Sequence, residues 1–299
     1  NSAQFITGDS MNPKIVANYA CEIGEGPLWN PANHHLYWTD IPTGRMFWLN
    51  TITGEHNQFY NGRVVGGFTI QRDGNLLLFM DRGTVAILEQ GKLSYLIPDI
   101  PTEKENRFND VVADPVGRVF CGTMPSNMDR LNERLGRLYR LDTDGSMTLI
   151  LDEICNPNGM AFTPDHTQMY YTDSLMQKIY IFDYNIKNGT LSNQRVFVDT
   201  HENNGLPDGL TVDSNGYVWS AQVMSSCLIR YSPQGDEVQR VAIPTSAVTS
   251  LTFAGKDCTD IYVTTAGGSN KTGNLSRAGA LYQLNLGIKG IPEYQSNIS

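Results

Sequence analysis

The sequence predicts an all-β fold, a six-bladed β-propeller with four-stranded blades, from two observations. First, a pair of short apolar strands joined by a polar turn occurs six times along the chain. Second, no segment shows the apolar periodicity of a helix longer than about two turns. Four short strands fit in each period of roughly 40 to 50 residues, and repetition of such a unit is typical of propellers.

The clearest copy of this repeat runs from Leu206 to Trp219. Residues 213–216 read Asp-Ser-Asn-Gly, a sequence that tolerates the positive φ angles of a tight hairpin turn. Apolar residues alternate on both sides of this turn, as they do in strands. We therefore expect Asp208 to open the first strand of a hairpin.

The remaining strands follow from alignment on this copy. Other first strands are expected at 25–29, 66–70, 109–113, 158–162 and 249–253. Second strands are expected at 36–40, 76–79, 119–123, 169–173, 217–220 and 261–265, and third strands at 45–49, 137–141, 178–182, 227–231 and 280–284. The best helical candidate, 127–134, lies between two strands of the third repeat and is expected to be a loop over one face.

The two ends of the chain complement each other in this scheme. Segment 14–19 precedes the first repeat without a partner of its own, and the sixth repeat lacks a clear fourth strand. We expect these ends to pair and close the ring. Residues 14–299 are thus predicted to form a single propeller domain, after an N-terminal tail over residues 1–13. The first ten residues of this tail are expected to be an expression remnant, with Met11 as the native start.

Composition narrows the classes of partner. Of the 299 residues, 40% are hydrophobic and 18% are charged, which suits a compact protein with a continuous core. A net charge of -9 argues against nucleic acid or an anionic membrane as a partner. The five cysteines form no Cys-x-x-Cys pair, so we expect them to be small buried hydrophobes in a cytoplasmic protein. A small molecule is the expected ligand.

One position of the repeat predicts a site. The innermost strands of a propeller run in the same direction along a central channel, so equivalent residues lie at one depth. In this chain the position holds Glu25, Gly66, Asn109, Asn158, Asp208 and Thr249. The set offers two carboxylates and two amide oxygens, donors that suit a hard divalent cation, and no Lys or Arg to neutralise the carboxylates. We therefore predict a metal site at one end of the channel.

Motifs distributed over nearly the whole chain carry a further signal. They are Gly24-Glu25-Gly26-Pro27-Leu28-Trp29, Asn106-Arg107-Phe108-Asn109-Asp110, Gly122-Thr123-Met124, Pro157-Asn158-Gly159-Met160-Ala161, Tyr170-Tyr171-Thr172-Asp173-Ser174 and Pro207-Asp208-Gly209. These motifs resemble the family of gluconolactonase, regucalcin (senescence marker protein) and luciferin-regenerating enzyme. The resemblance implies one divalent metal held by Glu25, Asn158 and Asp208, and hydrolysis of small lactones, often sugar lactones.

The same resemblance assigns substrate-binding residues. Arg107 and Asn109 match family positions that hold the substrate. Where some members carry an acidic residue after Gly-Thr-Met, this chain has Pro125-Ser126-Asn127, so Asn127 is the candidate at that position and the exact lactone stays open. We expect Arg107 to project from a loop at the channel mouth, where its planar guanidinium can bind substrate hydroxyls.

A mechanism follows from the predicted ligands. A bound cation supplies an electrophile for the lactone carbonyl oxygen and can acidify a water. Asp208 is the candidate catalytic residue, which accepts or orients the proton of that water, and Glu25 is the ligand that balances charge. Oxygen donors favour calcium or manganese, and the wide tolerance of the family also admits zinc or iron.

Two other functions are compatible with the ring. A calcium-dependent organophosphate hydrolase similar to diisopropylfluorophosphatase would use a similar arrangement of Glu, Asn and Asp. A non-catalytic, metal-binding propeller module is the third reading, because a fold does not fix a function. The sequence contains no Gly-x-Ser-x-Gly or His-Glu-x-x-His motif.

Overall fold

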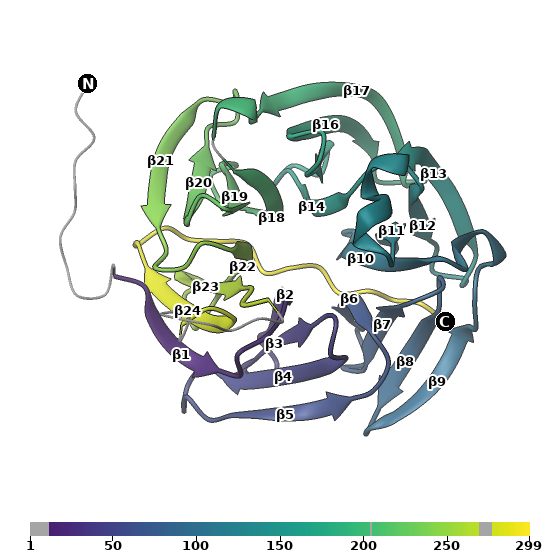
Figure 1. Cartoon of the computed structure of the whole chain (residues 1–299), viewed down its shortest axis with the longest axis horizontal. Coiled ribbons are helices and arrows are strands. Elements are labelled where there is room, and N and C mark those ends of the chain that lie inside the picture. Colours follow the sequence, from purple (N-terminus) through teal and green to yellow (C-terminus); the bar gives the residue numbers. More distant parts are fainter. Residues whose placement is uncertain (1–11, 204, 269–276) are drawn as a thin grey trace.

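The computed structural model describes residues 12–203, 205–268 and 277–299. These residues form six four-stranded antiparallel sheets arranged around a central axis (Figure 1). The predicted six-bladed propeller is therefore confirmed. The predicted N-terminal remnant, residues 1–10, and Met11 lie outside the described residues.

Each blade is one antiparallel sheet. From the innermost strand outward, the first three blades are β2 (Gly24–Asn30), β3 (His35–Asp40), β4 (Arg45–Asn50) and β5 (His56–Asn61); β6 (Val65–Ile70), β7 (Leu76–Met80), β8 (Val85–Glu89) and β9 (Lys92–Ile97); and β10 (Asn106–Ala113), β11 (Val119–Pro125), β12 (Gly136–Leu141) and β13 (Met147–Ile154). The other three are β14 (Pro157–Phe162), β15 (Gln168–Asp173), β16 (Lys178–Asn185) and β17 (Thr190–Asp199); β18 (Leu206–Val212), β19 (Val218–Val223), β20 (Cys227–Tyr231) and β21 (Glu237–Ala242); and β22 (Val248–Ala254), β23 (Asp260–Thr265), β24 (Ala280–Asn285) and β1 (Lys14–Asn18).

Helical structure within the described part of the chain is limited to short 3₁₀ turns. They are η2 (Pro101–Glu103), η3 (Met128–Glu133) and η4 (His201–Asn203). The turn η3 occupies the segment between β11 and β12 where the sequence predicted a loop with weak helical character. None of the helices in the described ranges is long and apolar enough to cross a membrane.

The ring closes as the sequence predicted. Strand β1, from the start of the described chain, pairs with β24 and completes the sixth blade, with Ala17 opposite Leu281 and Asn18 opposite Ala280. Because this pairing joins the two ends of the repeat array, opening the ring requires breaking a full strand pair. Figure 1 shows β1 on the outer edge of this blade.

The hydrophobic core is divided into clusters that lie between neighbouring blades. Each hydrophobic cluster joins residues of adjacent sheets, as where Phe79 of β7 meets Phe108 of β10 edge to face, with ring centroids 5.2 Å apart. Blades covered on both faces explain the nearly continuous apolar runs of the inner strands. All five cysteines are buried, as expected.

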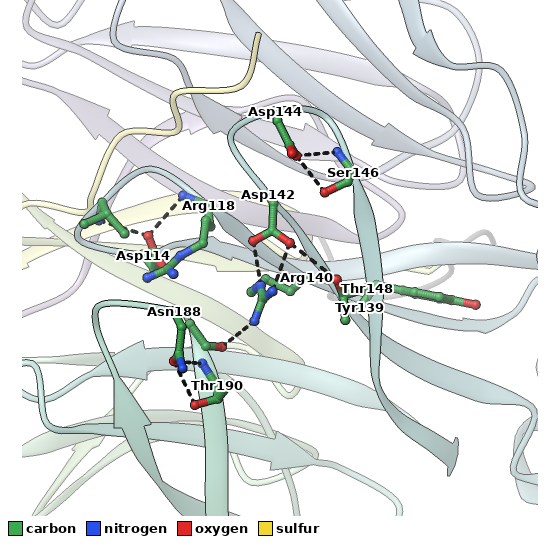
Figure 2. Close-up of polar contacts among 12 residues, drawn as sticks. Asp114, Arg118, Tyr139, Arg140, Asp142, Asp144, Ser146, Thr148, Asn188 and Thr190 are labelled. Atoms are coloured by element: carbon green, nitrogen blue, oxygen red, sulfur yellow. Dashed lines mark hydrogen bonds and ion pairs between the residues drawn. The ribbon is translucent and has the colours of Figure 1, made fainter.

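Two hairpin turns of the third blade are closed by ion pairs (Figure 2). Arg118 binds Asp114 at the turn between β10 and β11, and both side chains are almost fully buried. Arg140 binds Asp142 and donates to the backbone oxygen of Gly189 in the next blade. These pairs fix the third blade against the fourth.

A C-terminal strap, residues 286–299, follows β24 and crosses the centre of the ring (Figure 1). It contacts the fifth blade through a bridge between Gly290 and Asp213, and the second blade through a parallel bridge between Ser296 and Gln71. The strap thus links blades that are not neighbours in the ring.

Candidate metal centre and active site

Five of the six equivalent positions line one pocket with a cavity volume of about 240 Å³. They are Glu25, Asn109, Asn158, Asp208 and Thr249. The sixth, Gly66, is not among the lining residues. A Cβ atom at Gly66 would lie 1.9 Å from the backbone oxygen of Phe108, so the second blade packs at this point against the third, and a side chain has no room.

Every innermost strand is bulged at this position. In β18, Pro207 pairs with Gln222 and Leu210 with Ser220, so three steps along β18 match two along β19. The same kind of shift occurs at the equivalent place in β2, β6, β10, β14 and β22. A bulge bends its strand and redirects the side chains within it. This irregularity places Asp208 in the pocket wall.

A close backbone contact between the fourth and fifth blades brings candidate ligands of the two blades together. A Cβ atom at Gly159 would lie 2.2 Å from the backbone nitrogen of Leu210, so only glycine fits. Because Gly159 follows Asn158 and Leu210 lies two residues after Asp208, this close approach brings the two candidate ligands to the same cavity.

Arg107 lies inside β10, opposite Met124, and is buried. The expectation that it projects from a loop is therefore wrong, because β10 begins before Arg107 and continues through the bulge. It still lines the pocket. Its Nη1 atom donates to Asn109 Oδ1 at 2.7 Å, and Asn109 Nδ2 donates to Asn158 Oδ1 at 2.8 Å.

Asn127 has a different environment. It is exposed at the start of η3, where its Oδ1 accepts a hydrogen bond from the backbone nitrogen of Asp129. It is not among the described residues that line the cavity, whereas its neighbours Met128 and Leu131 are. Substrate binding by Asn127 stays a prediction.

The electrostatics of the pocket favour a bound cation. Burial raises the pKa of Glu25 well above its ordinary value, and the nearby Asp208 and Asp110 raise it further. Burial likewise raises the pKa of Asp208, and Asp110 adds to the effect. Burial lowers the pKa of Arg107 to about 10, against the opposing influence of Glu25 and Asp208. Each of these shifts disfavours the charged form, and a cation would reverse it for the two acids.

Asp110 is an acidic residue to which the sequence assigned no role. Burial raises its pKa to about 6, and it lines a smaller cavity of about 40 Å³ together with Glu293 of the strap. Strict strand alternation would place Asp110 on the opposite side from Asn109. The bulge in β10 lets both face the channel, and no strand pattern in the sequence reveals it.

The donor set fits a hard divalent cation. Glu25 accepts one hydrogen bond, from the backbone nitrogen of Gly26 at 2.8 Å, and Asp208 accepts none from the described residues. Two buried carboxylates with unused lone pairs need a counter-charge. Across the described ranges, no three His, Cys, Asp or Glu side chains are grouped as metal ligands, so the amide oxygen of Asn158 would have to complete the set.

Comparison with known proteins identifies the family. Residues 23–267 match the model of the SMP-30/Gluconolactonase/LRE-like region. The chain belongs to this family. Pentonolactonase XacC of Haloferax volcanii is 44% identical over 96% of this chain and 99% of its own, and regucalcin of Bos taurus is 31% identical over 95% and 98%. The resemblance inferred from the motifs is confirmed.

Solved structures of similar proteins have the same architecture. A luciferin-regenerating enzyme superimposes with a TM-score of 0.86 at 27% identity, over 96% of this chain and 100% of its own. A calcium-binding protein, regucalcin from Agrobacterium tumefaciens, has a TM-score of 0.87 at 22% identity, over 95% and 97%. The second likeness concerns the fold alone.

Proposed function

We propose that this chain, a lactonase by its family, hydrolyses uncharged sugar lactones with one divalent cation held by Glu25, Asn158 and Asp208. Lactonases are carboxylic ester hydrolases, and the pentonolactonase of Haloferax volcanii is 44% identical over nearly the full length of both chains. The observation that carries the proposal is the buried pair Glu25 and Asp208, which shares one pocket with two asparagine side chains.

The three candidate ligands have separable roles. When bound, the cation supplies a Lewis acid for the lactone carbonyl oxygen and makes a nearby water more acidic. Asp208, the less hydrogen-bonded of the two acids, accepts the proton of the attacking water. The water oxygen then bonds to the carbonyl carbon, the ring C–O bond breaks, and the ring oxygen leaves as a hydroxyl by taking the proton back from Asp208. Glu25 balances charge, and Asn158 adds a neutral oxygen.

Arg107 is suited to hold the substrate. Its Nη1 is engaged by Phe108 and Asn109, whereas Nε and Nη2 donate to no residue in the described ranges. These N–H groups can donate to lactone oxygens. Among the described residues that line the cavity, Arg107 is the one cationic side chain. The carboxylates of Glu25 and Asp208 would offset the divalent cation, so Arg107 alone would have to balance the two negative charges of a phosphate group. The pocket therefore favours an uncharged lactone over a phosphorylated one.

The donor set favours some cations over others. Carboxylate and amide oxygens favour calcium or manganese, and zinc or iron would also be accepted by such a site.

A hydrolysis screen tests this proposal. The chelated protein is assayed with pentono- and gluconolactones, aliphatic lactones, a phosphorylated sugar lactone and a phosphotriester, each with calcium, manganese, zinc or iron(II). We expect turnover of uncharged sugar lactones that disappears on chelation and returns with a divalent cation. Turnover of the phosphotriester alone would support the organophosphate hydrolase. Cation binding without any turnover would support the binding module.

A further inference from the structure

We propose that Ser174 is a positioning residue that turns the oxygen of Asn158, and not its nitrogen, toward the cation. The proposal rests on the function proposed above, because it concerns the same cation site. Ser174 directly follows β15, is 2% exposed and lines the same cavity as Asn158 and Asp208.

An asparagine ligand has an ambiguity that a carboxylate lacks. The two ends of its amide have nearly the same size and shape, but only the oxygen can bind a cation. The hydrogen-bond partners of the amide, and not the shape of the pocket, therefore decide whether Asn158 can act as a ligand.

The contacts of Ser174 fix the orientation of the Asn158 amide from the side of its nitrogen. The Oγ atom of Ser174 lies 2.5 Å from the backbone oxygen of Pro207 and 2.7 Å from Asn158 Nδ2. A carbonyl oxygen can only accept, so the single hydroxyl proton is donated to Pro207. The hydroxyl must then accept from Asn158, which has to present its NH₂ group to Ser174 and its oxygen to the opposite side.

The contacts of Asn109 independently require the same orientation of the Asn158 amide. Asn109 Nδ2 donates to the backbone oxygen of Pro157 at 2.8 Å, and Asn109 Oδ1 accepts from Arg107. The carbonyl can only accept and the guanidinium can only donate, so the Asn109 amide has one orientation. It donates to Asn158 Oδ1 at 2.8 Å. Both neighbours of Asn158 thus require the same orientation of its amide.

Ser174 also forms a hydrogen-bonded bridge between the two blades. It links Asn158 on β14 to the backbone of Pro207 on β18, and Pro207 directly precedes Asp208. Without the hydroxyl, Asn158 Nδ2 and the oxygen of Pro207 would both lose a buried partner. The amide of Asn158 would then be held by Asn109 alone, and the hydrogen-bonded link between the two ligands through Pro207 would be lost.

The position of Ser174 is itself well determined. Its backbone nitrogen donates to the backbone oxygen of Asn156. The carboxylate of the preceding Asp173 accepts from the backbone nitrogens of Cys155 and Asn156, at 3.1 Å each. The loop before β14 is therefore tied to the end of β15, which gives Ser174 a rigid base.

A double-mutant cycle tests the proposal through metal affinity. Calcium and manganese dissociation constants are measured by titration calorimetry on chelated parent, Ser174→Ala, Asn158→Asp and the double variant. In the parent background, Ser174→Ala should weaken binding about 10- to 100-fold, as loss of supporting contacts around ligands does. In the Asn158→Asp background the effect should fall below about threefold, because either carboxylate oxygen can then bind the cation.

Three results would overturn the proposal. Equal weakening in both backgrounds would show that Ser174 acts on the fold in general, and unchanged affinity in Ser174→Ala would show that it does not position the ligand. A parent that binds neither cation would remove the metal site, and the proposed function with it. Should Ser174→Ala not fold, Ser174→Cys keeps the size with weaker hydrogen bonds and should show the same dependence on background.

Discussion

Asp114 and Asp208 are both buried carboxylates near innermost strands, yet their surroundings differ completely. Asp114 Oδ1 accepts from the backbone nitrogens of Val116, Gly117 and Arg118, and its Oδ2 accepts from the Arg118 guanidinium (Figure 2) and from the hydroxyl of Tyr184. Asp208 accepts no hydrogen bond within the described chain. Burial alone therefore does not separate a structural acid from a functional one. What separates them is the number of hydrogen-bond donors that the protein supplies to the carboxylate.

The largest effect is expected for Asp208→Asn. This change keeps an oxygen of similar shape for a cation but removes the basic carboxylate, so kcat for lactone hydrolysis should fall on the order of a hundred- to ten-thousandfold. Metal content, measured by elemental analysis, should fall far less. Hydrolysis as fast as in the parent at equal metal occupancy would show that Asp208 is not the proton acceptor.

The matched change at the other site, Asp114→Asn, should act on stability instead. It leaves the buried Arg118 without its counter-charge, so the free energy of unfolding should drop by about 3 kcal/mol in urea titrations. The kcat of the folded fraction should be that of the parent. A loss of kcat without a loss of stability would remove the contrast between the two acids.

Glu293 lies between Asp114 and Asp208 in the number of hydrogen bonds that its carboxylate accepts. It accepts one, from the hydroxyl of Thr211 at 3.0 Å. Burial raises its pKa to about 7 from an ordinary value of 4.5. The folded state therefore holds this proton more tightly than the unfolded state. Its contribution to stability is complete below pH 4.5 and is lost as the pH rises through 7.

Glu293→Gln should consequently remove part of the pH dependence. We expect the variant to lose about 2 kcal/mol less stability than the parent between about pH 5 and pH 8, in urea titrations with chelator present. Identical pH profiles for the two proteins would show that Glu293 has an ordinary pKa in the folded state.

The repeat made the fold and the positions of the ring predictable. Blade number, ring closure and the set at Glu25, Asn109, Asn158 and Asp208 all follow from one hairpin pattern that recurs at a fixed spacing. Pattern reasoning works for this fold because equivalent residues of a propeller occupy equivalent depths. A single copy, such as the Asn-Gly pair at Asn158, would have indicated only a turn.

The parts that could not be predicted depend on local irregularity. The bulge in β10 adds a residue without changing the apolar pattern, so the channel position of Asp110 was hidden. The burial of Arg107 was hidden because β10 begins at Asn106, before the predicted strand at 109–113. The orientation of the Asn158 amide depends on Ser174, sixteen positions later in the chain, and on a carbonyl of the next blade. Such contacts exist only once the sheets are packed.

The C-terminal strap covers one end of the central axis of the ring. Glu293 and Tyr294 lie across the inner strands on the side away from Glu25 and Asp208, and the segment is fastened through Ser296 and Ser299 to two further blades. We therefore expect a molecule in the pocket not to leave through this end of the axis. Substrate and hydroxy-acid product would then share one opening, and a bound product would exclude the next lactone.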